Sequence, residues 1–214
     1  MTAPPSTSEL PTVLLTGFDP FAGADTNPSW DAVAVLARDW DERAEGARLA
    51  VARLPVVFDQ VRERLADLVE EHAPAVVIAT GLAGGSARVR IERVALNLAD
   101  ARIPDNDGGQ PIDAEVSPGA PLARQATLPV KAALAACRAQ DLPVEISLSA
   151  GTFVCNATFV HALDLAPQAR VGFVHVPAVE DLALAETVRA IREIVRAALG
   201  HAGADLHVVG GEIS

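Results

Sequence analysis

Cys155 is the residue in this sequence whose type and position best suit covalent chemistry. The run Val144–Leu148 alternates as a strand does, and the residues after Cys155 have apolar side chains at helical spacing, so the thiol is expected where a strand and turn lead into a helix. The first turn of a helix has free backbone N–H groups and the positive end of the helix dipole, which favour an anion. Such a position favours the reactive thiolate and offers donors for an oxyanion. A cysteine among Phe and Val side chains is also typical of a small core residue, so this stretch alone leaves both interpretations open.

His175 is the best candidate for the base that a nucleophilic thiol requires. It lies at the end of an apolar strand, just before Pro177, and α/β proteins place reactive groups at strand ends. Histidine can take a proton from a thiol and return it to a leaving amine near neutral pH. The other histidines are expected in a helix or in the Gly-rich tail.

Two carboxylates could orient the ring of His175. Glu92 is favoured because it belongs to an expected strand over residues 88–100, in which period-two alternation puts it on an apolar face. The residues that share this face are Val94, Leu96 and Leu98. A carboxylate there is either bent away at a bulge or buried for a purpose. Asp105 is the second choice, because it lies in the long loop over residues 102–121, of a kind often found at functional sites.

Apolar strands and amphipathic helices alternate along the chain. Strands are expected over residues 13–18, 48–54, 75–80, 144–148 and 171–176, and helices after residue 29 and over residues 58–68, 130–138, 155–166 and 179–199. This alternation predicts a single-domain α/β layer fold with helices on both faces. Residues 1–11 are expected to be a disordered lead-in, and residues 12–214 the folded domain.

Composition excludes several classes of protein. The formal net charge of −11 argues against a nucleic-acid or anionic-membrane partner, and no apolar run is long enough to span a bilayer. Two cysteines, Cys137 and Cys155, make no disulfide framework, which together with the lack of an export signal points to the cytoplasm. Histidines and cysteines lack metal-ligand spacing, so no metal or other cofactor is expected.

Several motifs, in order from residue 12 to about residue 178, resemble those of a known family. They are residues 17–21 (GFDPF), 27–30 (NPSW), 81–85 (GLAGG), 92–97 (ERVALN), 100–106 (DARIPDN), 150–156 (AGTFVCN) and 175–177 (HVP). Together they resemble pyroglutamyl peptidase I, the pyrrolidone-carboxylate peptidase family of cysteine peptidases. The resemblance implies an open α/β/α sandwich with a twisted, mixed and largely parallel sheet. It also implies removal of an N-terminal pyroglutamyl residue from peptides, and a homo-oligomer of two or four subunits.

The resemblance assigns roles to individual residues. The catalytic Cys, His and Glu of the family fall on Cys155, His175 and Glu92, and a loop arginine that supports the oxyanion falls on Arg102. The substrate-pocket positions fall on Phe18, Phe21, Asn27, Leu82, Ile103, Phe153 and Val154. Aromatic walls suit a small, flat, neutral lactam, whose N–H and C=O could be met by a Gly-rich backbone and by Asn27.

Four positions depart from the pattern of the family. They are Leu82 and Ser86, where Gln and Arg are usual, Val56, where Thr is usual, and Ala157, where a polar residue is common. The first three leave open an amidohydrolase of the same mechanism that takes another small cyclic amide. A non-catalytic binder of pyroglutamyl ligands is disfavoured, because binding alone needs no thiol, imidazole and carboxylate together.

Overall fold

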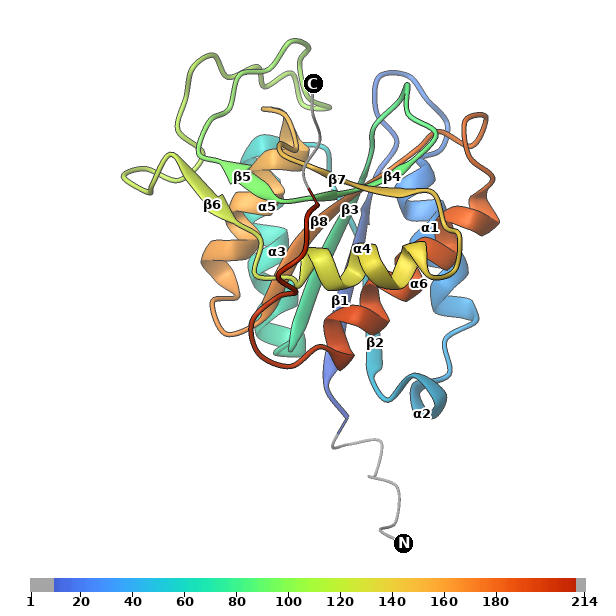
Figure 1. Cartoon of the computed structure of the whole chain (residues 1–214). Coiled ribbons are helices and arrows are strands. Elements are labelled where there is room, and N and C mark those ends of the chain that lie inside the picture. Colours follow the sequence, from blue (N-terminus) through green and yellow to red (C-terminus); the bar gives the residue numbers. More distant parts are fainter. Residues whose placement is uncertain (1–9, 211–214) are drawn as a thin grey trace, which may run out of the picture.

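A six-stranded sheet in the order β2-β1-β3-β8-β4-β7 forms the centre of the molecule (Figure 1). Its strands are β1 (Thr12–Phe18), β2 (Arg48–Leu54), β3 (Val76–Leu82), β4 (Val89–Glu92), β7 (Val144–Ser147) and β8 (Arg170–Val176). Every neighbouring pair is parallel except β4 and β8, which are antiparallel. The computed structural model describes residues 10–210. The expected mixed, largely parallel sheet is therefore confirmed.

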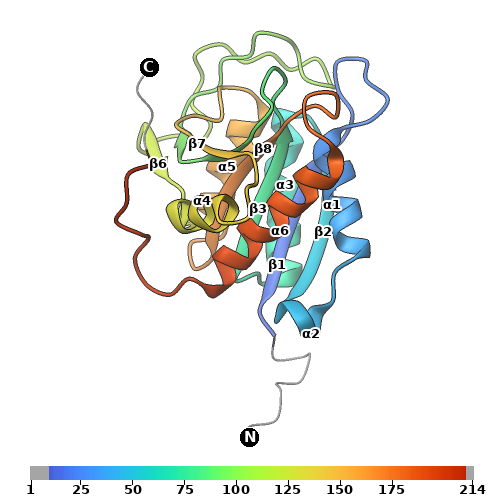
Figure 2. The ribbon, with the colours of Figure 1, turned by 45° about the vertical axis from the view of Figure 1, so that its right-hand side comes forward.

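Helices cover both faces of this sheet, as expected (Figure 2). One face packs against α1 (Pro28–Arg38), α4 (Val130–Arg138) and α6 (Leu184–Gly200), and the other against α3 (Phe58–His72) and α5 (Val154–Leu165). A short helix, α2 (Glu42–Glu45), precedes β2. The central strands β1, β3 and β8 are buried almost throughout, which explains why their sequences are predominantly apolar. Among the described residues, no helix is long and apolar enough to cross a membrane.

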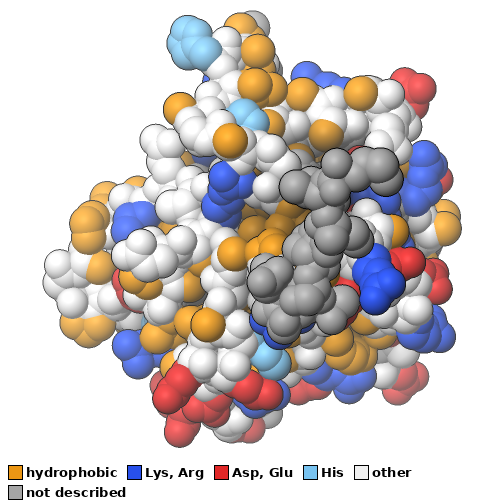
Figure 3. Space-filling model, turned by 90° about the horizontal axis from the view of Figure 1, so that it is seen from below, with side chains coloured by type: hydrophobic (Ala, Val, Ile, Leu, Met, Phe, Trp, Pro, Cys, Tyr) orange, Lys and Arg blue, Asp and Glu red, His pale blue; other side chains and the backbone are white. Residues whose placement is uncertain are grey.

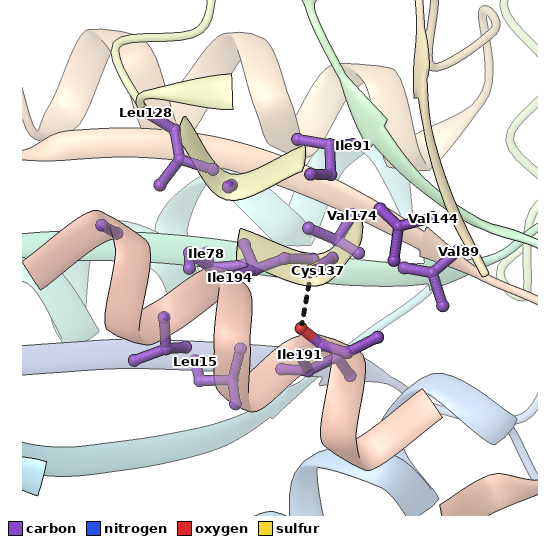
Figure 4. Close-up of a cluster of buried hydrophobic side chains, with 14 of the residues drawn as sticks. Leu15, Ile78, Val89, Ile91, Leu128, Cys137, Val144, Val174, Ile191 and Ile194 are labelled. Atoms are coloured by element: carbon purple, nitrogen blue, oxygen red, sulfur yellow. Dashed lines mark hydrogen bonds between the residues drawn. The ribbon is translucent and has the colours of Figure 1, made fainter. Parts of the chain in front are cut away.

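Cys137 belongs to the core on the α4 and α6 face, as predicted (Figure 4). Its side chain is fully buried, and its Sγ lies 3.9 Å from the carbonyl oxygen of Ala190. Burial, together with the negative charge of Glu193, raises the pKa of this thiol to about 12. Cys137 is therefore an inert packing residue at neutral pH.

The expected strand over residues 88–100 is wrong, because the chain changes partners at Arg93. The Arg93 N–H donates to the carbonyl of Ser147, beside the large sheet, whereas its own carbonyl accepts from the N–H of Ala126. The chain then continues as β5 (Val94–Leu96), which pairs only with β6 (Ala123–Gln125) in a separate antiparallel sheet. The last helix also begins at Leu184 instead of residue 179, after a turn over residues 178–182.

Long loops occupy the edge of the sheet at which β1, β3 and β8 end. Figure 1 shows the chain between β5 and β6 extending over this edge, opposite the end from which β1 starts. Figure 3 shows the other end of the molecule, where acidic and basic side chains are interspersed among apolar ones. The lead-in expected over residues 1–11 falls almost entirely outside the described residues.

Candidate active site

Cys155 is the second residue of α5, as the sequence predicts. The helix begins at Val154 after Phe153, which has extended backbone and provides no side-chain cap. The turn before it passes through Gly151 at a φ of 79°, a conformation that glycine adopts without strain. Because the first N–H groups of an α-helix have no acceptor within the helix, donors are available beside the half-buried thiol.

His175 and Glu92 form a buried hydrogen-bonded pair. His175 Nδ1 lies 2.8 Å from Glu92 Oε1, and the two residues are only 7% and 1% exposed. The antiparallel pairing of β4 with β8 sets Glu92 opposite Phe173 and Arg90 opposite His175, so the carboxylate and the imidazole project from the same face of adjacent strands. Within the described residues, the other carboxylate oxygen, Oε2, has no hydrogen-bond partner.

The reason for which the sequence favoured Glu92 is wrong, although the residue does reach His175. In β4 it is Val89 and Ile91 that share the alternate buried positions, while Glu92 shares its face with Arg90. Val94 and Leu96 lie in β5 and are only partly buried. Glu92 is buried because β4 lies between β7 and β8, and not because it belongs to an apolar stripe that continues along one strand.

The thiol of Cys155 lies against β3, directly beside the strand that carries His175. Gly81 of β3 pairs in register with His175 of β8, and a Cβ placed on Gly81 would lie 2.8 Å from Cys155 Sγ. Since Nδ1 of His175 contacts Glu92, Nε2 is the ring nitrogen left for the thiol. Burial lowers the pKa of His175, but Cys155 and Glu92 outweigh it and raise that pKa to about 9. The site therefore favours an imidazolium at neutral pH.

Asp105, the alternative carboxylate, has a different place in the structure. Its Oδ1 accepts hydrogen bonds from the N–H groups of Asp107 and Gly109, and its Oδ2 accepts one from the N–H of Phe58 at 2.9 Å. Phe58 is the first residue of α3, whose own N-cap residue Val57 provides no side-chain cap. Asp105 thus caps α3 from a distant loop and folds that loop upon itself.

An apolar cavity of about 130 Å³ opens beside the thiol. It is lined by Phe18, Phe21, Asn27, Val56, Leu82, Phe153, Val154 and Cys155. Six of the seven residues predicted from the sequence to form the pocket are among these. Ile103 is not, and is 37% exposed in the loop after β5. Val56, which the sequence marked as a departure from a usual Thr in the wall of the pocket, does line the cavity.

Asn27 has less hydrogen-bonding capacity for a ligand than the sequence suggested. Its Oδ1 accepts from both the N–H and the hydroxyl of Ser29, and its Nδ2 donates to the carbonyl of Asp19. The residue is the N-cap of α1, which explains this arrangement. One Nδ2 hydrogen is left, so the remaining polar contacts of a ligand in the cavity fall to the main chain.

Hydrogen bonds join the segment that carries Arg102 to the turn before Cys155. The Asp100 N–H donates to the Thr152 carbonyl, and the Thr152 hydroxyl donates to the Asp100 carbonyl at 2.7 Å. The exposed Arg102 therefore lies on a segment held next to the start of α5.

Asn156, which the sequence analysis missed, makes a second connection to the same segment. Its fully buried side chain donates to the carbonyls of Leu96 and Leu98 and accepts from the N–H of Leu96. In the sequence, the feature that could have indicated this residue is an amide side chain directly after the candidate nucleophile, at a helical position that faces the core.

A thiol, an imidazole and a carboxylate in this order are suited to nucleophilic acyl transfer. The thiol would form the acyl intermediate, and the imidazole would move the proton. Within residues 10–210, no three His, Cys, Asp or Glu side chains are grouped so as to hold a metal ion.

Comparison with known proteins gives a consistent family. Residues 11–199 match the family described as pyroglutamyl peptidase. The chain is 48% identical to the pyrrolidone-carboxylate peptidase of Gloeobacter violaceus over 85% of this chain and 89% of that protein. It is 44% identical to the pyrrolidone-carboxylate peptidase of Clavibacter michiganensis over 95% of this chain and all of that protein.

Solved structures of pyroglutamyl peptidases resemble this fold over most of the chain. The crystal structure of pyroglutamyl peptidase I from Bacillus amyloliquefaciens superposes with a TM-score of 0.87 at 35% identity, covering 94% of this chain and all of that one. Pyrrolidone carboxyl peptidase from Thermococcus litoralis superposes with a TM-score of 0.82 at 36% identity, covering 89% of this chain and 94% of that one.

Proposed function

The chain belongs to the pyroglutamyl peptidase family of cysteine peptidases, and we propose that it removes N-terminal pyroglutamyl residues from peptides with Cys155, His175 and Glu92. The observation that supports these roles most is the position of His175. Its ring is held by a buried carboxylate at 2.8 Å on one side and adjoins the thiol-bearing turn on the other. A structural histidine needs no such pair of partners.

In the first half of the proposed reaction, Cys155 becomes acylated. His175 already holds the thiol proton as an imidazolium, and Sγ attacks the carbonyl carbon of the pyroglutamyl residue, whose oxygen becomes an oxyanion. The N–H groups in the first turn of α5 are the proposed donors to this oxyanion, with Arg102 as further support. The imidazolium then protonates the leaving amine as the C–N bond breaks, which leaves a thioester on Cys155.

In the second half, water hydrolyses the thioester. His175 takes a proton from the water molecule, whose oxygen attacks the thioester carbonyl. Breaking the C–S bond releases free pyroglutamate and leaves Cys155 as a thiolate beside the imidazolium of His175. Throughout, Glu92 keeps Nδ1 occupied, so Nε2 stays turned to the reacting atoms, and it stabilises the imidazolium each time it forms.

The cavity beside Cys155 suits the lactam ring. Its aromatic walls come from Phe18, Phe21 and Phe153, and they favour a small, flat and neutral group. A free N-terminal Gln has a cationic amine, whose transfer into this cavity would cost several kcal/mol, on the order of other unpaired buried charges. We therefore propose that the blocked N-terminus is selected by the exclusion of charge.

Two residues that depart from the pattern of the family line this same cavity, and they motivate an alternative substrate. Leu82 and Val56 present aliphatic groups where Gln and Thr are usual, so this wall lacks the polar side-chain atoms of those residues. A thiol amidohydrolase that takes another small cyclic amide would use the same three groups. A pyroglutamyl substrate is favoured over another cyclic amide, because the main chain around the cavity can still form hydrogen bonds with the N–H and C=O of the lactam.

A direct assay distinguishes these functions. The pyroglutamyl amide of a fluorogenic amine should be hydrolysed, and the prolyl and free glutaminyl amides of the same amine should not. Iodoacetamide should abolish this activity with the label on Cys155. Cleavage of the glutaminyl amide as fast as the pyroglutamyl amide, or full activity after complete Cys155 labelling, would contradict the proposal.

The state in which the enzyme works is also part of the proposal. We propose a cytoplasmic homo-oligomer of two or four subunits, supported by the resemblance of the sequence to this family and by its two free cysteines. Light scattering on the eluting protein would give the subunit number.

A further inference from the structure

We propose that Gly81 is a positioning residue whose missing side chain creates the place in which the Cys155 thiol lies beside His175. This inference rests on the proposed role of Cys155 as nucleophile. Gly81 is the sixth residue of β3, which is buried from its first residue to this one, and its register partner on β8 is His175. Paired residues of neighbouring strands project to the same face of the sheet, so any side chain at position 81 would stand next to the imidazole.

The space above Gly81 is already filled. A Cβ at this position would lie 2.8 Å from Cys155 Sγ, 2.9 Å from Phe173 Cζ and 3.2 Å from Phe173 Cε1. The first two distances are shorter than non-bonded carbon and sulfur atoms tolerate. Gly81 has no positive φ, so its backbone conformation is one that other residues adopt. The requirement for glycine is therefore one of space and not of conformation.

An added methyl group would displace the thiol more readily than the aromatic ring. Phe173 is fully buried, and its ring packs against Phe18, Phe159 and the imidazole of His175, with ring centroids 6.5, 6.1 and 4.8 Å away. A ring in such a close-packed core has no free volume to enter. The Cys155 side chain is short and half-buried, and one rotation about χ1 moves its sulfur. The fold would survive this rotation, whereas the contact of sulfur with imidazole would be lost.

The substitution Gly81→Ala should therefore affect chemistry more than folding. A nucleophile displaced by about 1 Å costs roughly 100-fold in rate, and we expect a loss of about that size in kcat/KM for the pyroglutamyl amide. The rate of Cys155 alkylation by iodoacetamide should fall by about tenfold or more. The pKa of His175 should also fall, because Cys155 no longer helps to raise it, so the alkaline limb of the activity should move to lower pH.

Gly172→Ala is the matched control. Gly172 lies on β8, and its Cβ would meet Leu128 Cδ2 at 2.8 Å and Leu128 Cβ at 2.9 Å, an overlap of the same size as that at Gly81. Leu128 belongs to the core on the other face of the sheet. This variant should lower Tm while the alkylation rate and the alkaline limb of the activity stay as in the parent enzyme.

A double-mutant cycle tests the contact without relying on activity. In the Cys155→Ala background the sulfur is absent, so Gly81→Ala should lower Tm by roughly half as much or less. The Tm loss that remains is expected from the overlap of the new methyl group with the ring of Phe173. If Gly81→Ala alone does not fold, folding of the double variant supports the proposal, and failure of both overturns it. An alkylation rate within about twofold of the parent, or a Tm loss that Cys155→Ala leaves unchanged, also overturns it. If the parent enzyme kept full activity after complete alkylation of Cys155, the proposed function would be wrong. The double-mutant cycle would still test the contact between position 81 and Cys155 by itself.

Discussion

Replacing Glu92 by Gln keeps the size of the side chain and one hydrogen bond to His175, but it removes the buried negative charge. In the native site Glu92 Oε1 lies 2.8 Å from Nδ1, in surroundings from which water is almost excluded. The neutral variant leaves the imidazolium with the cost of burial and with the thiolate as its main compensation. Each step of the reaction in which His175 carries the extra proton should therefore become slower.

The size of the effect follows from the pKa of His175. Burial lowers this pKa, and Cys155 and Glu92 together raise it from 6.5 to about 9, which corresponds to roughly 3 kcal/mol in favour of the imidazolium. Because burial opposes both groups, the contribution of Glu92 alone is of the same order as this net value, and its loss from the transition state would lower kcat by about 100-fold. KM should change little, because Glu92 contacts the base and does not line the substrate cavity.

The pH profile provides a second readout with a defined sign. A raised pKa keeps His175 protonated up to about pH 9, so the activity of the parent enzyme should fall as the pH rises through that value, where the leaving amine loses its acid. In Glu92→Gln the same fall should occur at lower pH. Steady-state kinetics on the pyroglutamyl amide between pH 5 and pH 10 would measure both effects.

Asp105→Asn is the control for this experiment. It removes one acceptor from the three main-chain hydrogen bonds of Asp105, and should lower the free energy of unfolding by about 1 kcal/mol while kcat stays within about threefold. A Glu92→Gln enzyme with near-native kcat and an unmoved alkaline limb, beside an inactive Asp105→Asn enzyme, would refute the reasoning and transfer the third role to the loop.

Three further outcomes are expected. Cys155→Ser should abolish turnover with Tm retained, because a hydroxyl ionises far less readily than a thiol, whereas Cys137→Ser should keep activity and lose Tm by placing a hydroxyl in the core. Dithiothreitol should activate an oxidised sample and EDTA should leave it unchanged; loss of activity with EDTA that zinc restores would overturn the thiol mechanism. Burial, followed by the positive charge of Arg62, lowers the pKa of His161 to about 4, so the unfolded chain binds the extra proton between pH 6.5 and pH 4. The free energy of unfolding should therefore fall across that window by up to about 3 kcal/mol, and a His161→Leu variant that shows the same fall would contradict this.

Local patterns in the sequence were sufficient to predict the elements that carry the nucleophile and the base. The strand before Cys155, the helix after it and the strand that ends near His175 are where the periodicity of apolar residues places them. Each of these elements is a continuous stretch of sequence in which apolar residues recur with the period of a strand or of a helix. That period follows from backbone geometry, which is the same in every protein.

Contacts between distant segments were outside the reach of such patterns. From period-two alternation, Glu92 was expected to belong to one long apolar strand. The chain instead leaves the large sheet at Arg93, because the residues that follow β4 pair with β6 and not with β7 or β8. Which carboxylate meets His175 depends on the antiparallel pairing of β4 with β8. The sequence of neither strand contains that information, because pairing is decided by how all the strands and helices pack together.

The same limit applies to the finer features of the site. The sequence named six residues that line the cavity, but it could not show that the Asn27 amide is largely occupied by the fold, or that Ile103 lies elsewhere. It placed Gly81 in the motif over residues 81–85 and assigned it no role of its own. Only the tertiary structure identifies what approaches it, since the sulfur of Cys155 is brought there by a helix more than seventy residues later in the chain. Residue type and local spacing determined the chemistry available to this protein, and packing across the sheet decided which groups meet.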